Sequence, residues 1–203
     1  MSLTEKSRLP DVVNKYEQDI LQDWMKQQLS VDTLRADLIK EAELREQSAK
    51  FLALFRRALQ NGSLADMTTS HWDEVRELLA DVSASRARQG FTPSETATFV
   101  FSLKQPLFTR LQKELGKDGD AFMAEVWAAT VLLDKLGLHT MEMFQKSREE
   151  VIGRQQQGLL ELSTPVVRLW EGVLALPLIG TLDSERTQIV MQNLLQRIVE
   201  TGS

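Results

Sequence analysis

Few residues in this chain have a type and spacing suited to chemistry. His139 and Glu142 lie one helical turn apart, so one helix face could present an imidazole beside a carboxylate. A carboxylate metal site in a helical bundle needs paired Glu-x-x-His motifs, whereas this chain contains 2 His, neither in that order. We therefore expect no metal site, and we interpret His139 as a partly buried or interfacial side chain.

Ser184 is the second candidate, because it stands between two acids and close to Arg186. No G-x-S-x-G turn surrounds it and no His is near in sequence, so a nucleophilic role is not expected. The chain has 0 Cys, which excludes thiolate metal sites and cysteine nucleophiles. We expect no catalytic residue and no enzymatic activity, and the residues alone favour a helix cap for Ser184.

Composition excludes several other classes of function. The 203 residues carry a net charge of −5 without a basic stripe, which argues against binding to nucleic acid. No apolar run reaches the length of a membrane-spanning helix, and the mixed-charge start is unlike a signal peptide. With the lack of Cys, these features are typical of a cytoplasmic protein.

Hydrophobic spacing predicts a mainly α fold, and its helices must position any site. A capping box, Thr92-Pro93-Ser94-Glu95, marks the clearest helix start, and Pro106 should kink the helix that follows. A helical pattern begins near Asp120 and continues to Leu162, and its first part is apolar on several sides. The pattern becomes polar at KSREEVIGRQQQ. This polar part is either a signalling linker or a solvated helix end. The other helices are expected at Pro10 to about Trp24, Val31 to Gln60, and Ser70 to about Gly90.

The pattern changes at Pro165. Two short apolar runs, Val166 to Trp170 and Val173 to Ile179, flank Glu171-Gly172 and predict a β-hairpin. A polar loop and an amphipathic helix that stops at Gly202 follow. A ribbon with one helix cannot bury enough apolar surface alone, so we expect either further strands in the natural protein or a borrowed partner.

The stretch ELSTPVVRLWEGVLALPLIGTLDSERTQ resembles the start of a STAS domain in RsbR-type sensor proteins of the bacterial stressosome. Upstream, SRARQGFTPSETATFVFSLK and KSREEVIGRQQ resemble the globin-like N-terminal sensory domain of the same family. The resemblance implies a globin-like domain over residues 1–150, a linker helix over 151–164 and a truncated STAS domain over 165–203.

The resemblance also implies a function. The chain would be a homodimeric stress sensor and scaffold that joins an RsbS-like STAS scaffold protein and an RsbT-like switch serine/threonine kinase in a large assembly. It would control the sequestration and release of that kinase, as an anti-sigma factor antagonist does. The alternative is a haem-based gas sensor of oxygen on the same scaffold.

Particular residues follow from the resemblance. In the family, the Ser or Thr of the stretch matched here by Gly180-Thr181-Leu182-Asp183-Ser184-Glu185-Arg186 is phosphorylated by the kinase, which makes Ser184 the expected phosphorylation site. Family dimers form through the last helices of the sensory domain, so Trp127 and Met141 are candidates for the shared surface.

The haem alternative fits the residues poorly. The proximal His of haem-binding relatives would fall just before the GFTPSE turn, and His71 and His139 lie elsewhere. If haem were bound, one of these two would have to supply the axial ligand. We therefore expect no cofactor. At the proximal segment the chain instead carries Ser83, Ser85, Arg86 and Arg88.

Overall fold

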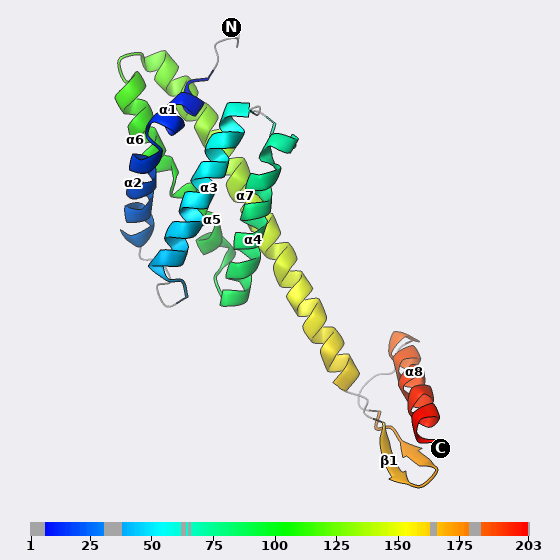
Figure 1. Ribbon diagram of the computed structural model, residues 1–203. Helices are drawn as coiled ribbons and strands as arrows, with labels where there is room; N and C mark the ends of the chain where they lie inside the picture. The colour runs from blue at the N-terminus through cyan, green and yellow to red at the C-terminus, as the bar shows by residue number, and fades with distance from the viewer. Residues whose placement is uncertain are drawn as a thin grey trace. The chain divides into compact units, whose positions relative to one another are not determined.

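The computed structural model describes residues 7–30, 38–61, 64, 66–162, 166–178 and 184–202, and the chain divides into two compact units at Arg148/Glu149 (Figure 1). The fold is mainly α, as the sequence predicts. Its elements are α1 (Leu9–Lys15), α2 (Glu17–Ser30), α3 (Glu41–Asn61), η1 (Ser70–Trp72), α4 (Asp73–Gln89), α5 (Pro93–Phe101), α6 (Lys104–Leu115), α7 (Gly119–Leu162), β1 (Val167–Trp170), β2 (Val173–Ala175) and α8 (Ser184–Thr201).

Local signals in the sequence set several helix ends. Thr92 accepts a hydrogen bond from the Glu95 amide at 3.2 Å, and the Glu95 carboxylate accepts one from the Thr92 amide at 2.7 Å. This reciprocal pair is the predicted capping box at the start of α5. Gly90 ends α4 with a φ of 91°, a left-handed conformation that glycine adopts without steric cost.

Pro106 has a larger effect than the kink we predict. The expected single helix is two helices, α5 and α6, separated by a turn at Ser102 and Leu103. Proline has no N–H to donate to the Ser102 carbonyl, and its ring clashes with that carbonyl in a continuous helix. In the first turn of α6 the missing donor costs nothing, so the break moves ahead of Pro106.

Two other predicted helix bounds are wrong. The first helix changes direction at Tyr16, whose φ of −113° and ψ of 20° separate α1 from α2. The bend accompanies hydrogen bonds from Tyr16 and Lys15 to the Glu114 carboxylate of α6, which a straight helix pattern does not encode. The helix expected from Val31 starts at Glu41 after a turn over residues 38–40, while residues 31–37 lie outside the described part.

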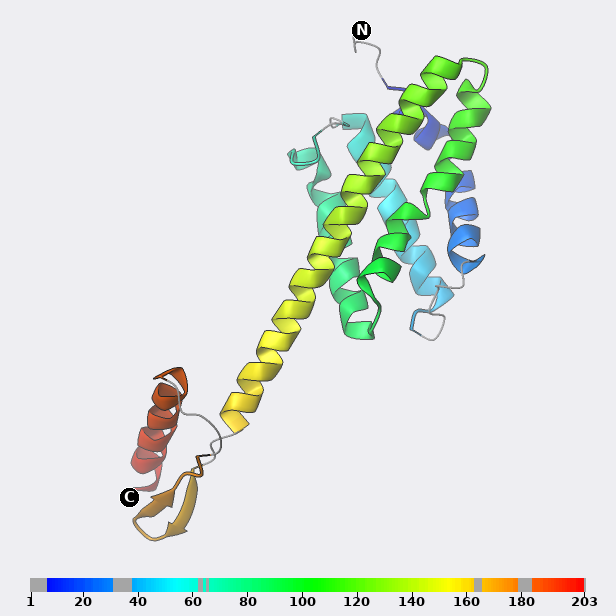
Figure 2. The same cartoon turned by 180° about the vertical axis from the view of Figure 1, so that it is seen from behind.

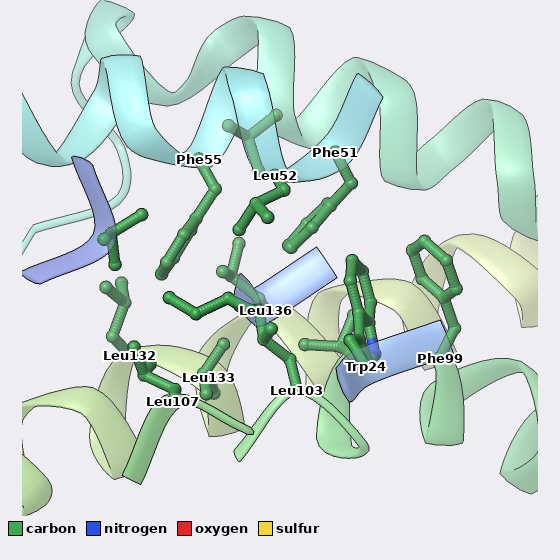
Figure 3. Close-up of a cluster of buried hydrophobic side chains, with 14 of the residues drawn as sticks. Trp24, Phe51, Leu52, Phe55, Phe99, Leu103, Leu107, Leu132, Leu133 and Leu136 are labelled. Carbon is green, nitrogen blue, oxygen red and sulfur yellow. The ribbon is translucent and has the colours of Figure 1, made fainter. Parts of the chain in front are cut away.

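An aromatic cluster fills the core of the first unit (Figure 3). The fully buried Trp24 ring lies 5.6 Å from Phe51 and 5.0 Å from Phe99, measured between ring centroids, and its indole N–H donates to Ser102 Oγ at 2.9 Å. These contacts join α2, α3 and α5. Leu103 from the turn before α6, Leu107 from α6, and Leu132, Leu133 and Leu136 from α7 add apolar side chains to the same core.

Helix α7 is tied to the first helix of the chain by one carboxylate. Glu125 accepts hydrogen bonds from Ser7 Oγ at 2.7 Å, from the Arg8 amide at 2.7 Å and from the Leu9 amide at 3.2 Å. The side chain therefore satisfies amides at the start of α1, where a helix has no backbone acceptors of its own. A residue more than a hundred positions away performs the work of an N-cap.

The second unit begins within α7 and contains the predicted hairpin and the helix after it. β1 and β2 pair antiparallel, with Val167 opposite Ala175 and Arg168 opposite Leu174, and Gly172 turns the chain with a φ of 75°. The strand–strand–helix order with which a STAS domain would begin is present. β2 ends at Ala175, earlier than the expected Ile179, which lies outside the described residues.

We predict that Glu125→Ala destabilises the first unit by about 1–3 kcal/mol, because two backbone amides and one hydroxyl lose a charged acceptor. Urea unfolding followed by circular dichroism measures the change. The exposed Glu149 on the same helix provides a control, and Glu149→Ala should stay within about 0.5 kcal/mol of the parent. Equal unfolding midpoints for the two variants would contradict the capping role of Glu125.

Candidate interaction surface

Helix α7 is apolar on two opposite sides. One side packs into the core of the first unit with a series of fully buried residues at helical spacing: Ala129, Leu132, Leu133, Leu136 and Thr140. Gly137 belongs to this side, and a Cβ placed there would lie 2.2 Å from Cε1 of Phe101. The glycine therefore allows the Phe101 ring of α5 to lie directly against the α7 backbone.

The other side, which we call the outer face, consists of Met123, Trp127 and Leu138, with the half-buried Val131 and Met141 beside them. Met123 is 63% exposed, Trp127 72% and Leu138 57%. Figure 2 shows this part of α7 on the outside of the helical unit, with no other described helix in front of it. The helical period also places Asp134, whose carboxylate lies 2.6 Å from Lys104 Nζ, on this side between Val131 and Leu138. Three large apolar side chains exposed on one helix face nevertheless indicate an interaction site.

The structure places both predicted interface residues on this surface. Trp127 is exposed, so it is not part of the core of the first unit. Met141 is half-buried at the margin of the face. The sequence shows that this segment is apolar on several sides, but the predicted interface does not include Met123 or Leu138. Their spacing from Trp127 was the available signal, because it repeats the helical period.

The two histidines do not meet. His71 is exposed in η1, whereas His139 is half-buried on α7, with Nε2 3.4 Å from the carbonyl oxygen of Arg76. His139 and Glu142 line an open hollow of about 410 Å³ together with Lys135, whose charge adds a third polar group. Within the described residues, no group of three His, Cys, Asp or Glu is placed to hold a metal ion.

The segment in which a proximal haem ligand is expected is packed with side chains. Ser83 is buried, and its hydroxyl lies within hydrogen-bonding distance of two carbonyl oxygens, that of Leu79 at 2.6 Å and that of Thr140 at 3.0 Å. Arg86 is buried beside Phe91 and Phe99. Neither residue can bind haem iron in the manner of a proximal His.

Ser184 is the first described residue of α8, and its side chain is exposed. The preceding residues of the matched stretch, 179–183, lie outside the described part of the chain. The first turn of a helix has free N–H groups and a positive dipole end, both of which favour a phosphate. Ser184 is thus exposed at the first residue of α8.

The second unit exposes many apolar side chains for its size. Trp170 is 71% exposed, Leu195 56% and Val199 82%. These residues belong to the hairpin and to α8. Within the described part of this unit, both elements therefore leave apolar side chains exposed to solvent. Along the described chain, no helix combines the length and the hydropathy needed to cross a bilayer.

Residues 18–159 match the profile of the RsbT co-antagonist protein rsbRD N-terminal domain. The chain belongs to this family. The match covers most of the first unit and continues along α7, ending before the hairpin. It confirms the resemblance to RsbR-type proteins that the sequence motifs indicate.

Curated relatives agree with the family assignment. The chain is 23% identical over 125 residues to RsbT co-antagonist protein RsbRA of Bacillus subtilis, an alignment that covers 62% of the chain and 45% of the relative. It is 25% identical over 113 residues to RsbT co-antagonist protein RsbRB of the same organism, covering 52% of the chain and 40% of the relative. The chain therefore spans less than half the length of either relative. No solved structure matches the chain.

Proposed function

We propose that this protein is a non-enzymatic regulator and scaffold of stress signalling, which dimerises through the outer face of α7 and controls the sequestration and release of a switch serine/threonine kinase. The family assignment supports a regulator of this kind, because the matched relatives are named as co-antagonists of RsbT. An RsbS-like STAS scaffold protein and an RsbT-like kinase are the partners we propose.

The exposed Trp127 carries this proposal. Trp127, which is 72% exposed between Met123 and Leu138, presents a large apolar area to water. Burying that area against a partner would contribute favourable free energy to binding. Trp and Met are enriched in protein interfaces, and Trp is common among the residues that contribute most binding energy. A second copy of the chain is the simplest partner, because one apolar strip can pair with itself around a two-fold axis.

The continuity of α7 suggests how dimerisation and output are joined. The helix crosses the unit boundary at Arg148 without interruption and continues to Leu162. Residues of the outer face and residues leading to the hairpin thus share one hydrogen-bonded backbone. A change in how two α7 helices pack would reach the start of the second unit along that backbone.

The exposed apolar residues of the second unit support a partner there as well. Val167 and Val173 on the two strands are 46% and 43% exposed, and Met191 on α8 is 48% exposed. We propose that STAS domains of the assembly cover these side chains. A two-stranded ribbon needs such additional packing to be stable.

We predict that Trp127→Glu converts the homodimer to a monomer at micromolar concentration, because a charge would be buried in an apolar interface. Light scattering coupled to size exclusion gives the mass. The circular dichroism spectrum should not change, since the side chain is not part of the core. Leu29→Glu is a matched control, as Leu29 is an apolar residue 42% exposed on α2, away from the outer face. A monomeric parent protein, or a Trp127→Glu variant that stays dimeric, would contradict the proposed interface.

We predict that a cognate switch kinase phosphorylates Ser184 in the full-length protein. A phosphate here faces the free amides at the start of α8, and the phosphorylated surface should bind the kinase differently. Mass spectrometry after incubation with kinase and ATP locates the modification, and Ser184→Ala should remove it. Labelling that persists undiminished in Ser184→Ala, at Thr181 or Thr187, would show that Ser184 is not the regulatory residue.

We also propose that the protein functions without haem, in contrast to a gas sensor built on the same scaffold. Ser83 and Arg86 occupy the proximal segment, and His71 is exposed to solvent. Protein purified and then incubated with haemin should therefore show no Soret band typical of an axial His ligand. A stable Soret band that is lost in His139→Ala or His71→Ala would support the gas sensor instead.

A further inference from the structure

Arg86 is a buried cation in the last turn of α4. Its side chain is only 4% exposed, although arginine is rarely buried without a partner. The guanidinium carbon lies over two aromatic rings, 5.4 Å from the centroid of Phe91 and 4.8 Å from that of Phe99. The rings stabilise the positive charge through their negative faces, but they accept none of its N–H groups in ordinary hydrogen bonds.

The guanidinium of Arg86 has no hydrogen bond or ion pair with any described residue, and its Nε is buried without an acceptor, although the Arg86 backbone carbonyl accepts from the Phe91 amide at 3.0 Å. Burial lowers the pKa of Arg86 to about 10, and the charge of Glu43 on α3 opposes that shift. The group therefore remains charged at neutral pH. Glu43 itself accepts a hydrogen bond from Gln47 Nε2 at 3.2 Å and forms no ion pair with the guanidinium.

A buried donor without an acceptor is costly, and a buried charge without a counter-ion more so. Such groups in folded proteins indicate a water, an ion or a functional role. The chain could have placed an apolar side chain between Phe91 and Phe99 at no such cost. Arg86 thus marks a position at which an external acceptor is expected.

We propose that Arg86 anchors a binding site for a small organic monocarboxylate. A guanidinium presents parallel N–H donors that match the two oxygens of a carboxylate, and this pairing is among the strongest that proteins use. A single negative charge is favoured over a phosphate dianion, because Glu43 already contributes one negative charge nearby. The aromatic rings favour an organic acid over a strongly hydrated inorganic ion.

The site is joined to the core and to α7 by direct contacts. Phe99 packs against Trp24 and Phe51 as well as against the guanidinium, with ring centroids 5.0 Å and 5.7 Å away. On α4, one turn before Arg86, the Ser83 hydroxyl lies 3.0 Å from the Thr140 carbonyl oxygen of α7. A ligand that fixes the guanidinium is therefore expected to change the environment of the Trp24 indole.

The test is a titration of the full chain followed by NMR, with acetate, propionate and butyrate as probes at constant ionic strength. The side-chain Nε–H signal of Arg86, assigned with Arg86→Lys, should shift and saturate, as should the indole N–H of Trp24. The Nε–H signal of Arg88, which is exposed in the same turn of α4, should not move. Affinity should fall about tenfold or more in Arg86→Lys, because an ammonium cannot bind in the bidentate manner.

Arg88→Lys is the matched control and should bind as the parent does, and circular dichroism verifies that both variants fold. The proposal is overturned if no carboxylate gives a saturating shift at Arg86. It is also overturned if Arg86→Lys, correctly folded, binds as well as the parent, or if chloride and phosphate produce the same shifts with equal affinity. An Nε–H signal that exchanges with water regardless of added carboxylate would identify water as the sole partner.

Discussion

The structure depends on how α7 is held. One side of this helix must fit the core closely, and Gly137 makes that fit possible because the Phe101 ring occupies the space of a side chain. Polar contacts also hold α7 against its neighbours: Lys104 Nζ lies 2.6 Å from Asp134, and Glu125 caps α1. With its inner side fixed in this way, α7 cannot rotate to bury its outer face. The exposure of Trp127 is therefore a consequence of the packing on the opposite side.

The same helix gives the family assignment a physical meaning. The assembly that we propose needs a surface through which copies associate and a connection from that surface to the second unit. In this chain, the first unit provides an apolar strip, and the backbone of α7 continues from that strip toward the hairpin. The alignments cover 45% and 40% of the two curated relatives. The partners of the second unit are therefore proposed and do not follow from the family assignment.

Sequence patterns predicted the elements that depend on local interactions. The capping box at Thr92, the glycine stop at Gly90, the long helix and the hairpin at Gly172 each follow from neighbouring residues, and the structure confirms them. Pro106 was predicted only to kink its helix, whereas the helix is broken before it. The break follows because the proline ring would clash with the Ser102 carbonyl in a continuous helix.

Contacts between distant residues were not predictable in the same way. Glu125 caps α1, which lies more than a hundred positions earlier in the chain. Arg86 is buried against the rings of Phe91, just after its own helix, and of Phe99 in α5. In the sequence, Glu125 and Arg86 look like ordinary surface charges on amphipathic helices. The bend at Tyr16 has the same origin, because its hydroxyl bonds to a glutamate on α6. Periodicity identifies which residues face inward, but it does not identify their partners.

Disulfide trapping tests most directly whether the outer face of α7 is shared by two copies. The chain has 0 Cys, so single cysteines can be introduced at Met123, Trp127 or Leu138 and, away from the face, at the exposed Leu29 or Lys50. We predict that mild oxidation yields linked dimers from at least one outer-face position, where symmetry brings identical residues within bonding distance, and none from Leu29 or Lys50. The absence of linked dimers at every outer-face position, or equal yields from the positions away from the face, would contradict dimerisation through α7.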